Sequence, residues 1–411
     1  MTSEVGRLRR VLVHEPGQEV DLMTPSVMEE LLFDDILHGA YARKEHRLFC
    51  RLMQLLDIEV LEAKDLLTES LAQEHARAWV FDLLQRNGID FPQSLNASSE
   101  ASVISESLCC GVRIDNPGNE LFEIQPLPNW CFQRDPQVVL GSGVVFPSMA
   151  TPARQRESIL SQVIFRFHPK LKQKQVILDM TGVTYKLPHK AARLEGGDVL
   201  ILSEQLIAVG CSKRTSLSAI QALARALSVQ EEGPKNLIVV EVPKKRAYMH
   251  LDTIMTPISE TECLVFPPVM LAGGREEARA FAFDLKKSDF SPVAEGNFLT
   301  LLKNYGHDYT PIPCGGWDPL SQQREQWTDG ANAFALAPGV ITLYDRNMKT
   351  VEELSRHGYR VMKAEDVVLG KEEISLDKQE RLALLLPSHE ISRARGGPHC
   401  LTHPLFRELL C

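Results

Sequence analysis

The sequence predicts an α/β fold. Short runs of apolar and β-branched residues recur along all 411 residues, and most of them alternate with polar residues or are bounded by glycine and proline, as strands are. Between these runs lie amphipathic stretches with apolar residues at spacings of three and four, which is the period of helices. The composition of 44% hydrophobic and 24% charged residues is that of a globular chain long enough to bury one large core or two moderate ones.

The strand-like runs extend from the first residues to the last third of the chain. In chain order they are RRVLVHEP (9–16), DIEVLEA (57–63), PQVVLGSGVVFP (136–147), KQVILDM (174–180), DVLILSEQLIAVG (198–210), NLIVVEVP (236–243), TECLVFPPVML (261–271), GVITLYD (339–345) and YRVMKAE (359–365). The amphipathic stretches between them predict helices over 152–168, 216–228, 275–286 and 297–306. Together they alternate as an α/β fold requires.

One segment, from Asp65 to about Glu120, departs from this alternation and contains no convincing strand. Residues 67–88 are typical of a helix that ends at Gly88, and residues 98–111 of a second helix with a serine cap and Gly111 at its end. We therefore expect a helical insertion at 65–120 within one domain of residues 1–411.

A second irregular segment runs from Leu369 to Glu390. It is charged at first, then leucine-rich, and ends near Pro387. This pattern is compatible with a helix lying over the mouth of a site or with an excursion on the surface, and the surface excursion is favoured.

Charge and hydropathy exclude two classes of partner. The net charge is -9 and the pI is near 5.8, with basic residues scattered rather than clustered, so no basic field attracts nucleic acid. No stretch approaches the roughly 20 apolar residues of a membrane helix, and the first ten residues, MTSEVGRLRR, carry charges where a signal peptide is apolar. We expect a cytoplasmic protein without a nucleic-acid or membrane partner.

The nine cysteines show no repeating spacing, and the adjacent pair Cys109 and Cys110 has no CxxC partner. In a reducing compartment they are expected to be free thiols. A single cysteine is more often a small buried hydrophobe than a catalyst. A function for Cys400 therefore depends on its neighbours.

Acidic residues mark two short segments. In LPNWCFQRDP (127–136) the polar residues end in Asp135, in an aromatic neighbourhood where a polar group needs a partner. In RLEGGDVLIL (193–202) Glu195 and Asp198 bracket two glycines directly before an apolar strand, which presents a carboxylate at a strand end. Taken singly, the first is also typical of a loop with a structural Arg-Asp pair and the second of a common turn.

The third segment, YMHLDTIMT (248–256), contains His250 and Asp252 in apolar surroundings. If the segment is a strand, both side chains point to the same face. A histidine beside a carboxylate in a dry pocket is an arrangement for general acid and base catalysis. A metal site is the less favoured alternative, because no further motif completes the ligand set.

The fourth segment, RARGGPHCLTHP (393–404), surrounds Cys400 with two arginines, two histidines and a pair of glycines. The glycines allow a tight turn that exposes the cysteine. Arg393, Arg395 and the histidines supply positive potential, which favours the thiolate over the thiol. A cysteine with a histidine and a carboxylate elsewhere in the chain is the pattern of covalent catalysis.

Together these motifs resemble those of the arginine deiminases, which belong to the guanidino-group modifying superfamily. The resemblance extends from Ser3 to Cys400. It rests on SEVGRLRRVLVHEPG, LLFDD, LPNWCFQRDP, ARQRE, LEGGD, MHLDT, REQWTDGAN and SRARGGPHC, which occur in the family's order and approximate spacing. It implies a pseudo-fivefold α/β propeller of ββαβ units with a helical insertion, and hydrolysis of free L-arginine to L-citrulline and ammonia. It implies no metal and no organic cofactor, and we expect a homo-oligomer.

The resemblance also assigns catalytic roles. Asp135 and Asp252 hold the substrate guanidinium through charge-assisted hydrogen bonds, and Cys400 attacks its carbon. His250 protonates the leaving nitrogen and then activates water. Glu195 orients the imidazole and favours its charged form.

The other end of the substrate is assigned to further residues of the same motifs. Those that match the family's substrate contacts are Arg154, Arg214 and Arg395 for the α-carboxylate, Asn129 for a polar contact, Phe132 for an apolar wall and Ala394 for its carbonyl. Arg134 and Asp198 are expected to brace the site. Alanine at 394 departs from the usual glycine, so binding there requires dihedral angles that suit alanine.

Several other functions share this pattern. Amidino transfer to an amine, hydrolysis of methylated arginine and breakdown of arginine to ornithine use the same cysteine and histidine. A protein that binds arginine without turnover is the alternative from another class, and the complete set of reactive residues argues against it.

Overall fold

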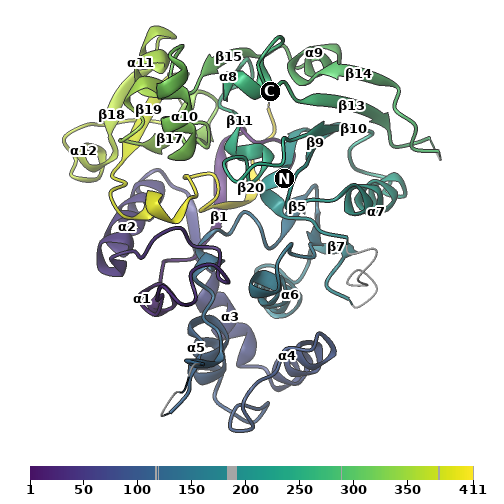
Figure 1. Ribbon diagram of the computed structural model, residues 1–411, viewed down its shortest axis with the longest axis vertical. Coiled ribbons are helices and arrows are strands. Elements are labelled where there is room, and N and C mark those ends of the chain that lie inside the picture. The colour runs from purple at the N-terminus through teal and green to yellow at the C-terminus, as the bar shows by residue number, and fades with distance from the viewer. Residues whose placement is uncertain (116–117, 119, 183–191, 288, 378–379, 411) are drawn as a thin grey trace.

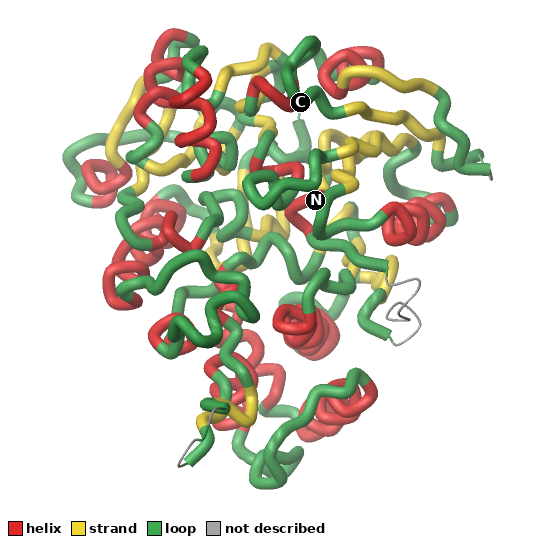
Figure 2. Tube along the Cα trace, in the orientation of Figure 1, coloured by secondary structure: helices red, strands yellow, loops and turns green. Residues whose placement is uncertain are grey.

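Small sheets form the inner part of the molecule and helices lie around them (Figures 1 and 2). The computed structural model describes residues 1–115, 118, 120–182, 192–287, 289–377 and 380–410. The helices of this part of the chain are α1 (Gln18–Asp21), α2 (Gly39–Leu55), α3 (Ala63–Leu71), α4 (Glu74–Arg86), α5 (Ala101–Cys110), α6 (Gln155–Phe167), α7 (Leu217–Ser228), α8 (Pro267–Met270), α9 (Phe298–Asn304), α10 (Pro319–Trp327), α11 (Met348–Arg356) and α12 (Ala364–Val368). The mixed α/β class predicted from the sequence is confirmed.

Most of the sheets combine parallel and antiparallel strands. In spatial order, the described strands form β2 (Glu59–Glu62), β1 (Leu8–Val13) and β20 (His403–Arg407); β5 (Val138–Leu140), β6 (Gly143–Phe146) and β7 (Gln175–Asp179); β14 (Ala294–Asn297), β13 (Arg279–Asp284), β10 (Asn236–Glu241), β9 (Leu206–Cys211) and β8 (Val199–Ser203); β11 (Met255–Pro257), β12 (Glu262–Val265) and β15 (Thr310–Pro313); and β16 (Phe334–Ala337), β17 (Val340–Tyr344), β19 (Leu382–Leu386) and β18 (Arg360–Lys363). A short hairpin pairs β3 (Val112–Arg113) with β4 (Phe122–Ile124).

Strands from the two ends of the chain share one sheet. β1 pairs in parallel with β2 and antiparallel with β20, so that Leu12 lies opposite His403. The imidazole Nε2 of His403 accepts a hydrogen bond from the Val139 amide at 3.1 Å, which ties β20 to β5. The last strand is therefore fixed on both sides.

The predicted helix over 275–286 is wrong, because its central part is the strand β13. The sequence RAFAFD alternates, and Ala280 and Ala282 are fully buried against β10, where Val239 lies opposite Phe281. A period of two and continuous pairing with a buried strand outweigh the helical spacing of the flanking residues. The predicted strand over 261–271 is likewise too long, since α8 begins at Pro267.

Neither interpretation of residues 369–390 describes the whole segment. Residues 369–377 are mostly exposed, in line with a surface excursion, and residues 378–379 lie outside the described part. The leucine run that follows is β19, which is buried along its length between β17 and β18 and parallel to both. A strand covered on both faces has a continuous apolar sequence, and this explains the run.

The segment between β2 and β4 consists largely of helices. Residues 67–88 form parts of two helices rather than one, because the chain turns between α3 and α4. The residue before α5 is Glu100, and its side chain does not cap the helix, so the expected serine cap is wrong; Gly111 does end this helix, with φ 82°. The two-residue strand β3 also falls in this segment. In Figure 1, α3, α4 and α5 lie together at the bottom; α3 packs against α4, α5 and α6, and α4 also packs against α6.

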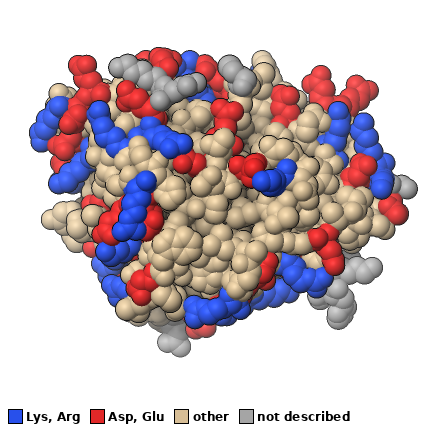
Figure 3. All heavy atoms as spheres, turned by 90° about the horizontal axis from the view of Figure 1, so that it is seen from above, with Lys and Arg blue, Asp and Glu red and all other residues tan. Residues whose placement is uncertain are grey.

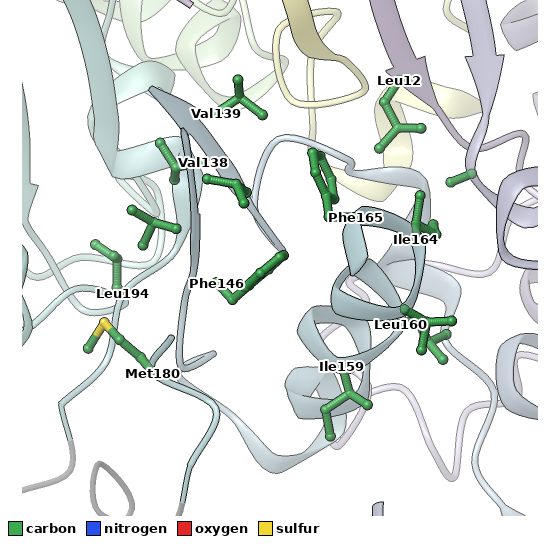
Figure 4. Close-up of a cluster of buried hydrophobic side chains, with 14 of the residues drawn as sticks. Leu12, Val138, Val139, Phe146, Ile159, Leu160, Ile164, Phe165, Met180 and Leu194 are labelled. Atoms are coloured by element: carbon green, nitrogen blue, oxygen red, sulfur yellow. The ribbon is translucent and has the colours of Figure 1, made fainter. Parts of the chain in front are cut away.

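A cluster of buried side chains joins β5, β6 and α6 (Figure 4). Phe146 at the end of β6 is fully buried, and its ring packs edge-on against Phe165 of α6, with ring centroids 5.9 Å apart. Met180 and Leu194 belong to the same cluster. This packing fixes the start of α6, where Arg154 lies.

Phe146→Ala is expected to lower the free energy of unfolding by about 3 to 5 kcal/mol, because it removes a fully buried ring and leaves a cavity. Urea unfolding measures this loss. Phe406→Ala is the matched control: Phe406 lies in β20 but its side chain is exposed, so the loss there should stay within about 0.5 kcal/mol. Equal losses for both variants would contradict the described packing.

The surface carries charges of both signs. On the face seen from above, basic and acidic side chains alternate around the rim, and neutral atoms fill much of the centre (Figure 3). Among the described residues, no helix combines the length and the apolar character needed to cross a membrane.

Candidate active site

Three of the four segments singled out in the sequence line one small cavity of about 20 Å³, and the segment of Glu195 contacts its lining residue His250. That is room for about one water molecule. The cavity lies between the turn Pro128–Cys131, the turn Gly196–Asp198 before β8, the turn Leu251–Thr253 before β11 and the turn Ile391–Ala394 that leads to Cys400. It is lined by Leu32, Asn129, Phe132, Asp135, Arg154, Arg214, Met249, His250, Ala394, Arg395 and Cys400.

Two of the predicted site residues do not line the cavity but lie directly behind it. Glu195 contacts His250, and Asp252 contacts Cys400. Two lining residues, Leu32 and Met249, were not predicted as site residues. Each lies within a motif, LLFDD and MHLDT, but an apolar side chain there carries no chemical signal of its own.

The cysteine is held by its backbone. The amide of Cys400 donates to Asn332 Oδ1 at 3.0 Å, and its carbonyl accepts from the Arg134 amide at 3.1 Å. Gly396 is required in this turn, because a Cβ there would collide with the ring of Phe132. The thiol is buried, with Sγ 3.6 Å from Asp252 Oδ2.

The prediction that positive potential makes Cys400 a thiolate is wrong for the site as it stands. Burial raises the pKa of the thiol well above its ordinary value, and the carboxylates of Asp252 and Asp135 raise it further. Arg393 does not offset them, since its Nη2 pairs with Asp35 Oδ2 at 2.7 Å. Arg395 instead lies over the ring of Trp327, with its guanidinium carbon 3.4 Å from the ring centroid.

His250 lies between two carboxylates. Its Nε2 is 2.8 Å from Glu195 Oε2, and its Nδ1 is 3.8 Å from Asp135 Oδ1. Burial alone lowers the pKa of this imidazole, but Asp135, Glu195 and Asp198 outweigh burial and raise the pKa to about 10. The imidazole is therefore charged near neutral pH.

The segment of His250 and Asp252 is not a strand, although its sequence allows one. His250 has an extended backbone, with φ -138° and ψ 167°, and Leu251–Thr253 form a 3-10 turn. Asp198 fixes this turn, because its Oδ1 accepts a hydrogen bond from the Leu251 amide at 2.9 Å. The condition of a shared strand is therefore not met, because these polar residues belong to the turn that precedes β11.

A network of ion pairs surrounds the carboxylates. Arg154 Nη1 donates to Asp135 Oδ2 at 2.8 Å and to Glu195 Oε2 at 3.3 Å, and its Nη2 donates to Glu157 Oε2 at 2.8 Å. Burial raises the pKa of Glu195, but Arg214, Arg154 and His250 reverse this and lower it. Glu195 is thus an anion that orients and stabilises the imidazolium.

Asp135, Glu195 and His250 also form a group whose ligand atoms lie within 4.8 Å of one another, close enough to hold a metal ion. Arg154 already donates to both carboxylates of this group. A divalent ion would have to displace a buried guanidinium and meet a charged imidazole. The donor set fits an organic cation better than a metal.

Asp252 has one free acceptor. Its Oδ2 accepts from His399 Nδ1 at 2.8 Å, whereas its buried Oδ1 has no hydrogen-bond partner among the described residues. A buried carboxylate oxygen without a donor is costly. It is therefore an acceptor ready for a donor that enters the cavity.

The opposite wall combines polar and aromatic groups. Asn129 Nδ2 donates to the carbonyl of Leu31 at 2.5 Å. Arg395 has a left-handed backbone, with φ 66°, and its Nη2 donates to the carbonyl of Ala247 at 3.4 Å. Ala394 is in a 3-10 turn, a conformation that alanine adopts without strain, so its departure from glycine does not distort the turn.

The two residues expected to brace the site do contact its backbone. Arg134 Nε donates to the carbonyl of His399 at 3.2 Å, and Asp198 Oδ1 accepts from the Leu251 amide at 2.9 Å. Neither residue lines the cavity.

A family model described as arginine deiminase matches residues 29–108 and 93–407 of this chain. Among curated proteins, the arginine deiminase of Latilactobacillus sakei subsp. sakei is 33% identical over 434 residues, with 99% of this chain and 98% of the relative covered. The arginine deiminase of Listeria welshimeri is 34% identical over 437 residues, with 100% and 98% covered.

Solved structures share the fold at low sequence identity. An amidinotransferase from Microseira wollei superposes with a TM-score of 0.55 at 12% identity, covering 99% of this chain and 96% of the other. The N-terminal domain of ArgZ, covalently bound to a reaction intermediate, superposes with a TM-score of 0.53 at 15% identity, covering 98% and 99%.

Proposed function

Because the chain belongs to the arginine deiminase family, whose members are hydrolases of amidine C–N bonds, we propose that it hydrolyses free L-arginine to L-citrulline and ammonia at the cavity of Cys400. One observation carries the proposal: a buried cysteine, a charged imidazole and carboxylates meet at one small cavity. The full-length curated relatives support the same activity.

The carboxylates suit a guanidinium. The carbon of this group is a poor electrophile, because its positive charge is spread over three nitrogens, so it must be held and polarised. We propose that Asp252, through its free Oδ1, and Asp135 accept charge-assisted hydrogen bonds from the substrate. The carbon then faces Cys400 Sγ, which is 3.6 Å from Asp252 Oδ2.

The substrate also supplies the positive charge that the empty site lacks. A bound guanidinium next to Cys400 offsets Asp252 and Asp135 and lowers the pKa of the thiol, which releases its proton to the solvent. The thiolate forms an S–C bond. His250 then gives its proton to one terminal nitrogen as the C–N bond breaks, and ammonia leaves.

The second half-reaction returns the enzyme to its starting state. Neutral His250 takes a proton from water and the hydroxide attacks the amidino carbon. The S–C bond then breaks and the hydroxyl proton passes to the sulfur, which gives citrulline, the thiol and protonated His250. Arg154, Arg214, Arg395, Asn129, Phe132 and the Ala394 carbonyl are the proposed contacts to the rest of the substrate. Because the cavity has room for only about one water molecule, we propose that the segments that carry Leu32 and Arg395 move apart when arginine enters.

We also propose that the larger sheets form a pseudo-fivefold propeller and that residues 65–120 are an insertion in a single catalytic domain. The support is that the described residues form five separate sheets of three or more strands with helices around them, and that α3 packs against both α4 and α5 at the bottom of Figure 1.

The reaction is tested by counting products. We expect one ammonia per citrulline from L-arginine, and quenching during turnover should give protein with an amidino adduct on Cys400 by mass spectrometry. Ornithine as the product, or a requirement for an amine acceptor, would contradict deimination. Absence of any adduct or product would contradict the proposed function altogether.

Glu195→Gln should move the alkaline limit of kcat/KM to lower pH. In the wild type, His250 must be protonated, so activity is lost as the pH rises through its pKa of about 10. Glu195→Gln removes one of the negative charges that raise the pKa of His250. We therefore expect the alkaline limit of kcat/KM to fall by about one pH unit or more. The control is Glu69→Gln, which removes the exposed partner of His168 and should leave the pH profile unchanged.

A further inference from the structure

The motif REQWTDGAN, residues 324–332, has no role in the mechanism above, yet it ends beside both reactive segments. We propose that Asn332 is a positioning residue that holds Cys400 in register with Asp252 for the attack on the guanidinium carbon. This inference rests on the proposed function. Asn332 itself does not line the cavity, so it acts through the residues it holds.

One buried amide spans the two segments. Asn332 is fully buried, its Oδ1 accepts from the Cys400 amide at 3.0 Å, and its Nδ2 donates to the carbonyl of Asp252 at 2.9 Å. Cys400 and Asp252 are 68 and 80 positions away from Asn332 in the chain. A side chain at this position must both accept and donate, and asparagine does so with one short group.

The turn that carries Asn332 is fixed independently of the cysteine segment. Thr256 Oγ1 donates to the carbonyl of Ala331 at 2.7 Å, and Gln326 Nε2 donates to the carbonyl of Ala247 at 2.8 Å. Both partners flank the His250 and Asp252 turn. Asn332 is therefore fixed relative to His250 and Asp252. Its hydrogen bond to the Cys400 amide fixes Cys400 relative to the same two residues.

The cysteine segment is shaped to receive this contact. A Cβ at Gly397 would approach Asn332 Oδ1 to 2.6 Å, so only glycine lets the turn come close. The absence of a side chain at Gly397 thus leaves room for the side-chain amide of Asn332.

The position of Sγ relative to Asp252 decides two properties of the nucleophile. It sets how strongly the carboxylate raises the pKa of the thiol, and it sets the line of attack on the carbon held by that carboxylate. A displacement of about 1 Å of a reacting group costs on the order of 100-fold in rate. Loss of the Asn332 bridge should therefore act on kcat rather than on substrate binding.

Asn347 provides a matched control. It is also fully buried, and it holds the same turn from the other side: its Nδ2 donates to the carbonyl of Thr328 at 2.9 Å and its Oδ1 accepts from Thr328 Oγ1 at 2.6 Å. It makes no hydrogen bond to Cys400 or Asp252 within the described residues. Asn347→Ala should thus lower stability as Asn332→Ala does, without the same effect on the nucleophile.

The experiment compares both variants in the full-length protein. Asn332→Ala should lower kcat by about 100-fold with KM within about threefold, and should change the pH dependence of Cys400 alkylation by iodoacetamide. Asn347→Ala, at a similar loss of Tm, should keep kcat within about threefold and the wild-type alkylation profile. If both variants lose kcat equally, or if the alkylation profile of Asn332→Ala is that of the wild type, the positioning role is refuted.

A second variant keeps the inference testable if Asn332→Ala fails to fold. Asn332→Asp retains the shape and the acceptor but cannot donate to the Asp252 carbonyl when ionised. Its kcat, relative to wild type at each pH, should rise as the pH falls and the new carboxyl gains a proton to donate. A constant ratio at all pH values would refute the role. Citrulline formation by the wild type in the same assay separates this failure from failure of the proposed function.

Discussion

Cys400→Ala is expected to lower kcat by about 10⁴-fold or more, the loss typical of removing a covalent nucleophile. Arginine binding should remain measurable by calorimetry, because Asp135, Asp252 and the arginine side chains of the cavity are retained. Quenched protein should carry no amidino adduct.

The control is Cys50→Ala. Cys50 is a free cysteine on α2, outside the cavity, and its removal should leave kcat within about twofold of wild type. Citrulline production at the wild-type rate by Cys400→Ala would show that another group attacks the substrate.

His250→Asn should lower kcat by about 10²- to 10⁴-fold, the usual contribution of general acid and base catalysis. Asparagine retains a donor for Glu195, so the packing of the cavity survives, but it cannot protonate the leaving nitrogen or take a proton from water. The adduct on Cys400 should fail to accumulate in a rapid-quench measurement, because ammonia cannot leave.

His168→Asn separates this effect from the loss of any buried histidine. His168 is buried and its Nε2 lies 2.9 Å from Glu69 Oε2, but it is remote from the cavity. Its kcat should stay near the wild-type value. A His250→Asn variant with normal turnover would eliminate the acid and base role.

Strands were predicted where the sequence has a strong local pattern. Runs such as VLV in β1 or LIVVE in β10 are apolar and β-branched, and the structure forms strands there as predicted. The helix predicted over 275–286 failed because the pairing of β13 with β10 decides the conformation, and a partner strand about 40 residues away leaves no local signal.

The reactive side chains could be found from residue types in motifs, but their charge states could not. Arg393 was expected to favour the thiolate of Cys400, whereas it pairs with Asp35, 358 positions away. The effect of an arginine on a thiol depends on what neutralises it, and this is a property of the fold. Asn332 received no role for the same reason, since its contacts are with backbone groups of distant residues.

The pairing of β20 with β1, and its hydrogen bond to β5, determine when activity first arises during synthesis. Cys400 lies three residues before β20. A polypeptide still emerging from the ribosome therefore contains Asp135, Asp252 and His250 but still lacks the nucleophile Cys400. Domains tend to fold as they are made, from the N-terminal side, yet here the first strand must wait for the last. A prematurely terminated product would be inert towards arginine.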